Sequence, residues 1–136
     1  MNKKRIVILS QYFPPETTAA AKRAVSMAEA FSGEYDVKVI TTRPSSPSPA
    51  HFDPADVAEH DRKLQYGIKR VLHFPPHAGG LLIRGIREYI MAIRLGLSVI
   101  KEPADLIIAS TPSMFLAPVA LLAARRNNAK FIWDIR

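Results

Sequence analysis

The chain has 136 residues, 48% of them apolar, so length and composition exclude a fully disordered polymer and indicate one domain with a substantial core. Its 19 Lys and Arg residues against 12 acidic residues give a formal charge of +7, which favours anionic partners such as nucleotide phosphates, phospholipid headgroups or nucleic acid. The absence of cysteine excludes disulfides and thiolate chemistry and agrees with a reducing cytoplasm.

The first predicted element is a strand at residues 6–9, because this run is apolar on both faces, as in a central parallel strand. Three basic residues precede it, but the run is far too short for the apolar region of a secretory leader. No apolar stretch in the chain approaches the roughly 20 residues that are needed to cross a bilayer.

A helix follows, with Thr17 or Thr18 as its cap, apolar positions at helical spacing and Gly33 as its stop. Residues 37–40 form the second predicted strand. Four prolines among the serines of residues 43–61 predict a mobile loop that is irregular for most of its length, with one short helix near 54–60.

The second half continues the alternation. Residues 68–74 read as a strand, 81–100 as one long helix and 106–109 as the fourth strand. Thr111 and Pro112 predict a cap and a first-turn proline for a helix that runs to Arg126. That helix is apolar on nearly every side, so we expect it to be buried, with a bend at Pro118; residues 131–133 are the fifth strand.

Alternating strands and helices with right-handed crossovers predict an α/β, Rossmann-like, three-layer domain with a parallel sheet in the order 3-2-1-4-5. The carboxyl ends of parallel strands meet at one edge of the sheet, where such folds bind ligands. This edge would gather residues 12–18, 41–44, 74–80, 110–113 and 134–136.

Two cations, Lys22 and Arg23, fall near the first turn of the first helix, where the helix dipole disfavours positive charge. A bound anion would offset that cost, and the alternative is that both side chains point into water. The preceding loop has no glycine, so it is neither a Walker loop nor a dinucleotide-binding fingerprint.

Two carboxylates, Glu16 and Asp134, lie on the same predicted edge, and either could accept a proton from a sugar hydroxyl as a catalytic base. Glu16 could instead be an acid favoured by the dipole at a helix entrance, and Asp134 an ion-pair partner of Arg136 or Arg43. No His, Asp and Glu cluster has metal-ligand spacing, and no serine has a nucleophile signature.

The helix at 81–100 carries a separate pattern. At 100° per residue, Arg84, Arg87, Arg94 and Lys101 fall within an arc of about 100° beside an apolar arc that contains Ile86, Ile90, Ile93, Leu97 and Ile100. This pattern suits a helix that lies on an anionic membrane, and equally a core-facing crossover helix with a solvated basic face. Nucleic acid is disfavoured, because no aromatic platform or binding motif accompanies the charge.

Four segments resemble the amino-terminal lobe of family 4 glycosyltransferases, in particular the subgroup of bacterial cell-surface polysaccharide synthesis. They are IVILSQYFPPE at 6–16, VKVITT at 37–42, DLIIASTPSMFL at 105–116 and FIWDIR at 131–136. The likeness covers nearly the whole chain, and the order and spacing of the segments carry it.

The resemblance implies half of a GT-B architecture, in which two Rossmann-like lobes hold the active site between them. The first lobe mainly receives the acceptor and the second binds most of the nucleotide-sugar, and no metal or other cofactor is required. Residues 1–136 would then be the acceptor-side lobe without its donor-binding lobe, inactive alone. It would be cytoplasmic, with peripheral attachment to the inner face of the cytoplasmic membrane.

The resemblance also implies roles for individual residues. Donor phosphate and acceptor would be contacted by Tyr12, Pro15, Thr17, Thr18, Lys22, Arg23, Ser110, Thr111 and Arg136. The acceptor would be linked to polyprenyl diphosphate or be a glycan, and the basic helix would face its membrane. The chain departs from the family where Thr17 to Ala20 replace paired glycines and where Ser110 and Thr111 replace a histidine. The alternative function is a non-catalytic module that binds an anionic membrane or a partner.

Overall fold

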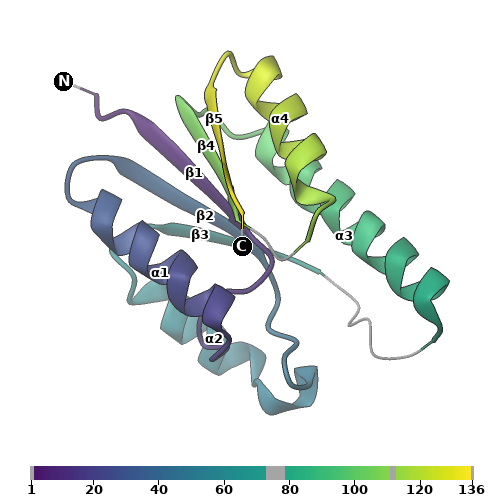
Figure 1. The fold of residues 1–136 in the computed structure, drawn as a ribbon. Coiled ribbons are helices and arrows are strands. Elements are labelled where there is room, and N and C mark those ends of the chain that lie inside the picture. The colour runs from purple at the N-terminus through teal and green to yellow at the C-terminus, as the bar shows by residue number, and fades with distance from the viewer. Residues whose placement is uncertain (1, 73–78, 111–112, 136) are drawn as a thin grey trace.

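A parallel five-stranded sheet with helices on both faces forms the structure, a computed structural model that describes residues 2–72, 79–110 and 113–135 (Figure 1). The strand order is β3-β2-β1-β4-β5, and each neighbouring pair is parallel, which confirms the predicted topology. The strands are β1 (Arg5–Ser10), β2 (Asp36–Thr42), β3 (Gly67–Val71), β4 (Leu106–Ser110) and β5 (Lys130–Asp134).

The central strands are apolar on both faces because helices cover each side of them. Helix α1 (Ala19–Ser32) lies over one face, and α3 (Leu81–Ile100) and α4 (Leu116–Arg126) lie over the other (Figure 1). Alternate residues of β1 therefore enter different cores: Ile6 and Ile8 pack with α1, whereas Val7 and Leu9 pack with α3 and α4.

The predicted starts and ends of α1 and α3 agree with the structure. Thr18 is the N-cap of α1, where its hydroxyl accepts a 3.1 Å hydrogen bond from the backbone N–H of Ala21. Small residues on the buried side of α1 let it approach the sheet closely: Ala21, Ala24 and Ala28.

The segment between β2 and β3 is more regular than its prolines predicted. A short 3-10 helix, η1 (Pro49–His51), is capped by Ser48, and α2 (Pro54–Arg62) is capped by Asp53. Each helix has a proline in its first turn, where the missing N–H costs no hydrogen bond, so these prolines start helices instead of breaking them. The short helix expected near 54–60 is confirmed by α2, and the mobility of 43–61 stays a prediction.

Helix α4 differs most from expectation. It begins at Leu116 after Phe115, and no side chain of the described residues caps it. Thr111 and Pro112, the predicted cap and first-turn proline, lie outside the described residues. Pro118 is the third residue of the helix, a position whose N–H needs no partner within the helix, and the expected bend there stays a prediction. The expected burial holds for one face only, because Leu122 is 60% exposed.

Helices α3 and α4 meet at a glycine. A Cβ added to Gly96 would lie 2.8 Å from the Cβ of Val119, closer than two such carbons can come. Gly96 is buried in α3, so its missing side chain is what lets the two helices pack against each other. The other glycine inside α3, Gly85, would have nothing within 4 Å of an added Cβ.

These two glycines give a matched pair of substitutions with opposite expected signs. Gly96→Ala should lower the free energy of unfolding by about 1–3 kcal/mol, because the added methyl group overpacks the α3–α4 contact. Gly85→Ala should raise it by about 0.5–1 kcal/mol, because alanine favours the helix and its methyl group meets no neighbour. Urea unfolding measures both, and a loss of equal size in the two variants would contradict the packing described.

Candidate functional site

Three serine and aspartate side chains stand in register at the carboxyl edge of the sheet. Ser10 pairs with Ser110 across β1 and β4, and Ser110 pairs with Asp134 across β4 and β5. Ser10 donates a 2.8 Å hydrogen bond from its hydroxyl to the carbonyl of Tyr12, and Ser110 donates one of 3.2 Å to Asp134 Oδ2. Hydroxyl groups and a carboxylate therefore gather where the sequence predicted a ligand site.

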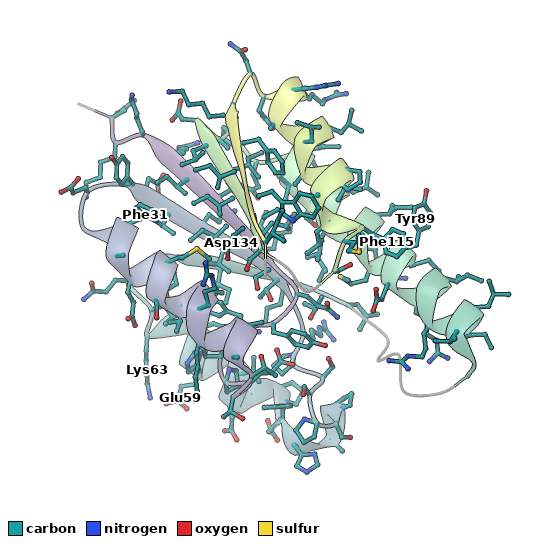
Figure 2. All side chains as sticks on the ribbon, in the orientation of Figure 1. Phe31, Glu59, Lys63, Tyr89, Phe115 and Asp134 are labelled. Carbon is teal, nitrogen blue, oxygen red and sulfur yellow. The ribbon has the colours of Figure 1, made fainter. Side chains whose placement is uncertain are left out.

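Asp134 forms a two-pronged ion pair with Arg23 of α1, in which Nε and Nη2 each donate to one carboxylate oxygen. Figure 2 shows Asp134 at the end of β5, on the side of the sheet that faces α1. This hydrogen bonding raises the pKa of the Arg23 guanidinium. The ion-pair alternative for Asp134 is therefore confirmed with Arg23 as a partner that was not predicted, and the predicted partner Arg136 lies outside the described residues.

Glu16 is a buried carboxylate, only 2% exposed, that joins two loops. One oxygen accepts hydrogen bonds from the backbone N–H groups of Ser45 and Ser46, at 2.9 and 3.0 Å, and the other accepts one of 3.3 Å from Phe13. Three donors from the chain itself thus surround the group that was predicted as a catalytic base. In this arrangement Glu16 fixes the shape of the edge and is closed to a substrate.

Tyr12 lies beside Glu16 on the loop after β1, and its pKa is raised by burial and by the negative charges of Glu16 and Glu88. Its hydroxyl oxygen accepts a 3.4 Å hydrogen bond from the side-chain amide of Gln11. Glu88 belongs to α3. A neutral phenol here can donate to an anionic ligand without first taking up a proton.

The other predicted contacts differ in their accessibility. Thr17 and Lys22 are exposed, Pro15 is half-buried, and Thr18 is committed to capping α1. Lys22 is therefore the cation of the α1 pair that remains for an anion, since Arg23 holds Asp134. Thr111 lies outside the described residues, as Arg136 does. The catalytic and binding roles of all these residues stay predictions.

Helix α3 has two apolar faces. The buried one contains Met91, Ala92, Leu95, Gly96 and Val99, all in the second half of the helix. The opposite face contains three members of the apolar arc that the sequence predicted: Ile86, Ile90 and Leu97, which are 51%, 44% and 56% exposed. The packing of α3 against the sheet therefore agrees with the crossover-helix interpretation, and the membrane interpretation of the exposed face stays a prediction.

The first half of α3 extends past the carboxyl edge of the sheet (Figure 1). Leu81 and Leu82 are 85% and 77% exposed there. The rings of Tyr89 and Phe115 meet edge to face at 5.9 Å, which ties this part of α3 to the segment before α4, and Figure 2 shows the two rings together. The sequence did not single out this aromatic contact, although Phe115 follows β4 closely.

The basic residues of α3 are not all equivalent. Arg94 donates a 3.0 Å hydrogen bond to the carbonyl of Leu72 at the end of β3, so it helps to hold α3 against the sheet. Arg84 and Lys101 are exposed at opposite ends of the helix. The membrane role predicted for Arg84, Arg87, Arg94 and Lys101 stays a prediction.

Sequence reasoning missed the burial of Ser113, which is 1% exposed and whose hydroxyl has no hydrogen-bond partner among the described residues. It also missed a cavity of about 860 Å³, which lies at the amino edge of the sheet beside Arg5, Asp36 and Tyr66. Burial raises the pKa of Tyr66 to about 12. This cavity is on the opposite side from the carboxylates above, so its size does not mark it as their substrate site.

Two kinds of site are absent from the described part of the chain. No helix within residues 2–72, 79–110 and 113–135 is both long and apolar enough to traverse a bilayer. Across the same residues, no group of three or more His, Cys, Asp or Glu side chains could hold a metal ion.

Comparison with known proteins supports the fold and nothing finer. No protein-family model and no curated protein sequence matches the chain. Two crystal structures of the C-terminal domain of the PF1911 hydrogenase from Pyrococcus furiosus are similar. One gives a TM-score of 0.60 at 13% identity and covers 98% of this chain and 92% of that one. The other gives 0.61 at 15% identity and covers 98% and 93%. At these identities the likeness confirms an α/β Rossmann-like fold.

The buried position of Glu16 leads to a prediction about stability. Glu16→Gln should lower the free energy of unfolding by about 1–3 kcal/mol. The new amide NH2 would replace one carboxylate oxygen and would face at least one backbone N–H group, so that two donors would meet and a hydrogen bond would be lost. Urea unfolding measures this change. Glu34→Gln is the matched control, since Glu34 is exposed, and it should unfold as the unaltered chain does. A Glu16→Gln chain of unchanged stability would show that the three hydrogen bonds do not hold the loops.

Proposed function

We propose that this chain is the acceptor-side lobe of a glycosyltransferase that moves a sugar from a nucleotide-sugar to a lipid-linked or polysaccharide acceptor in cell-surface glycan synthesis. In this proposal it acts in the cytoplasm, at the inner face of the cytoplasmic membrane, and a second Rossmann-like lobe binds most of the donor. Residues 1–136 alone would then not turn over, because catalysis needs donor and acceptor held together. The sequence motifs at 6–16, 37–42, 105–116 and 131–136 support this family.

One geometric observation carries the proposal: the exposed apolar face of α3 projects beside the edge that holds Tyr12, Ser110 and Asp134. A lipid-linked acceptor stays anchored in the bilayer while its sugar and diphosphate reach the enzyme. A helix that lies on the membrane next to the binding edge would bring the two together. Apolar side chains would enter the interface, and basic ones would contact anionic headgroups.

In this lobe alone, the charged side chains of the carboxyl edge are better placed to bind a ligand than to transfer a proton. Asp134 is held by Arg23, and Glu16 is closed off by backbone donors. Lys22 at the start of α1 and the neutral Tyr12 hydroxyl are left to contact a diphosphate. Asp134 keeps 15% exposure of its side chain and can accept a hydrogen bond from a sugar hydroxyl while it is paired.

The second candidate is a non-catalytic module that binds an anionic membrane. The same face of α3 favours it, and so does the fact that both predicted catalytic carboxylates already have partners within the chain. The two candidates differ in one respect. Only the glycosyltransferase lobe should respond to the headgroup of a lipid-linked sugar.

Sedimentation with phosphatidylglycerol vesicles tests the shared part of both candidates. The unaltered chain should bind, and Arg84→Gln should weaken its partition coefficient by about fivefold, since one basic residue near the surface contributes about 1 kcal/mol. Arg62→Gln is the matched control, because Arg62 is exposed on α2, away from α3. An unaltered chain that stays in the supernatant at low salt would contradict membrane binding altogether.

The same vesicles doped with a polyprenyl-diphosphate sugar separate the candidates. The glycosyltransferase lobe should bind doped vesicles more tightly than plain ones, and Lys22→Gln should remove that increase without changing the binding to plain vesicles. Equal binding to plain and doped vesicles would reject the acceptor role and leave the non-catalytic module.

A further inference from the structure

A second pocket lies at the carboxyl edge, at the end of the sheet away from Asp134. Its volume is about 460 Å³, within the range of small-molecule sites. It opens between the segment that follows β2 and the end of β3. Because β3 and β5 are opposite edges of the sheet, four strand spacings, or about 19 Å, separate it from the Arg23–Asp134 pair.

Hydrogen bonds within the chain define the walls of the pocket. The hydrogen bonds of Glu16 hold Ser45 and Ser46, so the chain that enters this segment is fixed to the loop after β1. Ser48 caps η1 and Asp53 caps α2, which sets the turn between the two helices. Glu59 and Lys63, which form an ion pair of 2.9 Å, mark α2 in Figure 2.

Most of the lining is apolar and poor in rotatable bonds. Seven residues supply it: Pro44, Pro49, Phe52, Pro54, Val57, Ala58 and Leu72. Proline rings and a phenyl ring suit a flat or compact apolar group, because they offer contact area at little cost in side-chain entropy. Val57 is 8% exposed, so it anchors the floor of the pocket to α2.

The charge of the pocket is set by one residue. Asp61 and Arg70 both line it, but they pair with each other, with Nε to Oδ2 at 2.8 Å and Nη2 to Oδ1 at 2.9 Å. The third nitrogen of Arg70, Nη1, donates to the carbonyl of Thr42, and Nη2 also donates to the carbonyl of Pro14. Arg43 is exposed at the rim, where no side chain within the described residues pairs with its guanidinium, and its backbone N–H is fixed by a 3.0 Å hydrogen bond to Val71.

We infer that this pocket is a binding site for a compact, flat apolar group that carries one negative charge, with the charge at Arg43. The apolar walls take the body of the ligand, and the Asp61–Arg70 pair contributes no net charge. The inference is independent of the proposed transferase role, because it uses neither the Arg23–Asp134 pair nor α3.

Protein-detected NMR with 2-naphthoate tests the inference, since this probe combines a flat apolar body with one carboxylate. Backbone amide signals of Phe52, Val57 and Leu72 should shift, and the neutral 2-naphthalenemethanol should bind more weakly at the same residues. Arg43→Gln should weaken naphthoate about threefold to fivefold, as expected for an exposed ion pair, and leave the alcohol unchanged. Ala58→Trp should fill the pocket and weaken both probes at least about tenfold.

Two matched substitutions control for general effects. Arg62→Gln removes an exposed cation of α2 that does not line the pocket, and Ala55→Trp adds the same bulk as Ala58→Trp to α2 outside the lining. Both should bind naphthoate as the unaltered chain does. The inference is overturned if no shifts occur at millimolar naphthoate, if the shifts fall on α3 and α4 instead, or if the controls lose as much affinity as Arg43→Gln and Ala58→Trp.

Discussion

The parallel pairing of β1 with β2 on one side and β4 on the other is the constraint from which the rest of the structure follows. It places β1 at the centre, where residues from Ile6 to Ser10 are buried, and it sends every loop after a strand to the same edge. Residues far apart in the chain meet there as a result. Arg23 and Asp134 are 111 positions apart, yet they form the ion pair that joins α1 to the edge strand β5.

The buried polar contacts of this edge are mostly made within the chain. Glu16 satisfies three backbone N–H groups, Arg70 joins Asp61 to two carbonyls, and Arg23 neutralises Asp134. Buried polar groups need such partners, because leaving one without a hydrogen bond costs about 1–3 kcal/mol. Most polar groups of the carboxyl edge are therefore hydrogen-bonded within the chain, and a few exposed cations, such as Lys22 and Arg43, are left that a ligand could contact.

Patterns that depend on local chemistry were predictable from the sequence. The run of residues in β1 that is apolar on both faces predicted a central strand, and the Thr18 cap and the pattern of α3 predicted where helices begin and end. The right-handed chirality of crossover connections predicted the strand order. Pairings between distant residues were not predictable: nothing in the sequence selects Arg23 over Arg43 as the partner of Asp134. The short helix expected near 54–60 was predictable and is confirmed by α2, whereas Pro49 misled, since it starts a 3-10 helix that Ser48 caps.

The central claim is that five parallel strands bring α1 and β5 together at one edge, and a double-mutant cycle on Arg23 and Asp134 tests it most directly. The free energies of unfolding of Arg23→Gln, Asp134→Asn and the double variant would be measured in urea against the unaltered chain. If the pair exists, the double variant should lose less stability than the sum of the two single losses, because either substitution already removes the shared interaction. Strictly additive losses would show that these side chains do not meet and would contradict the arrangement of the edge.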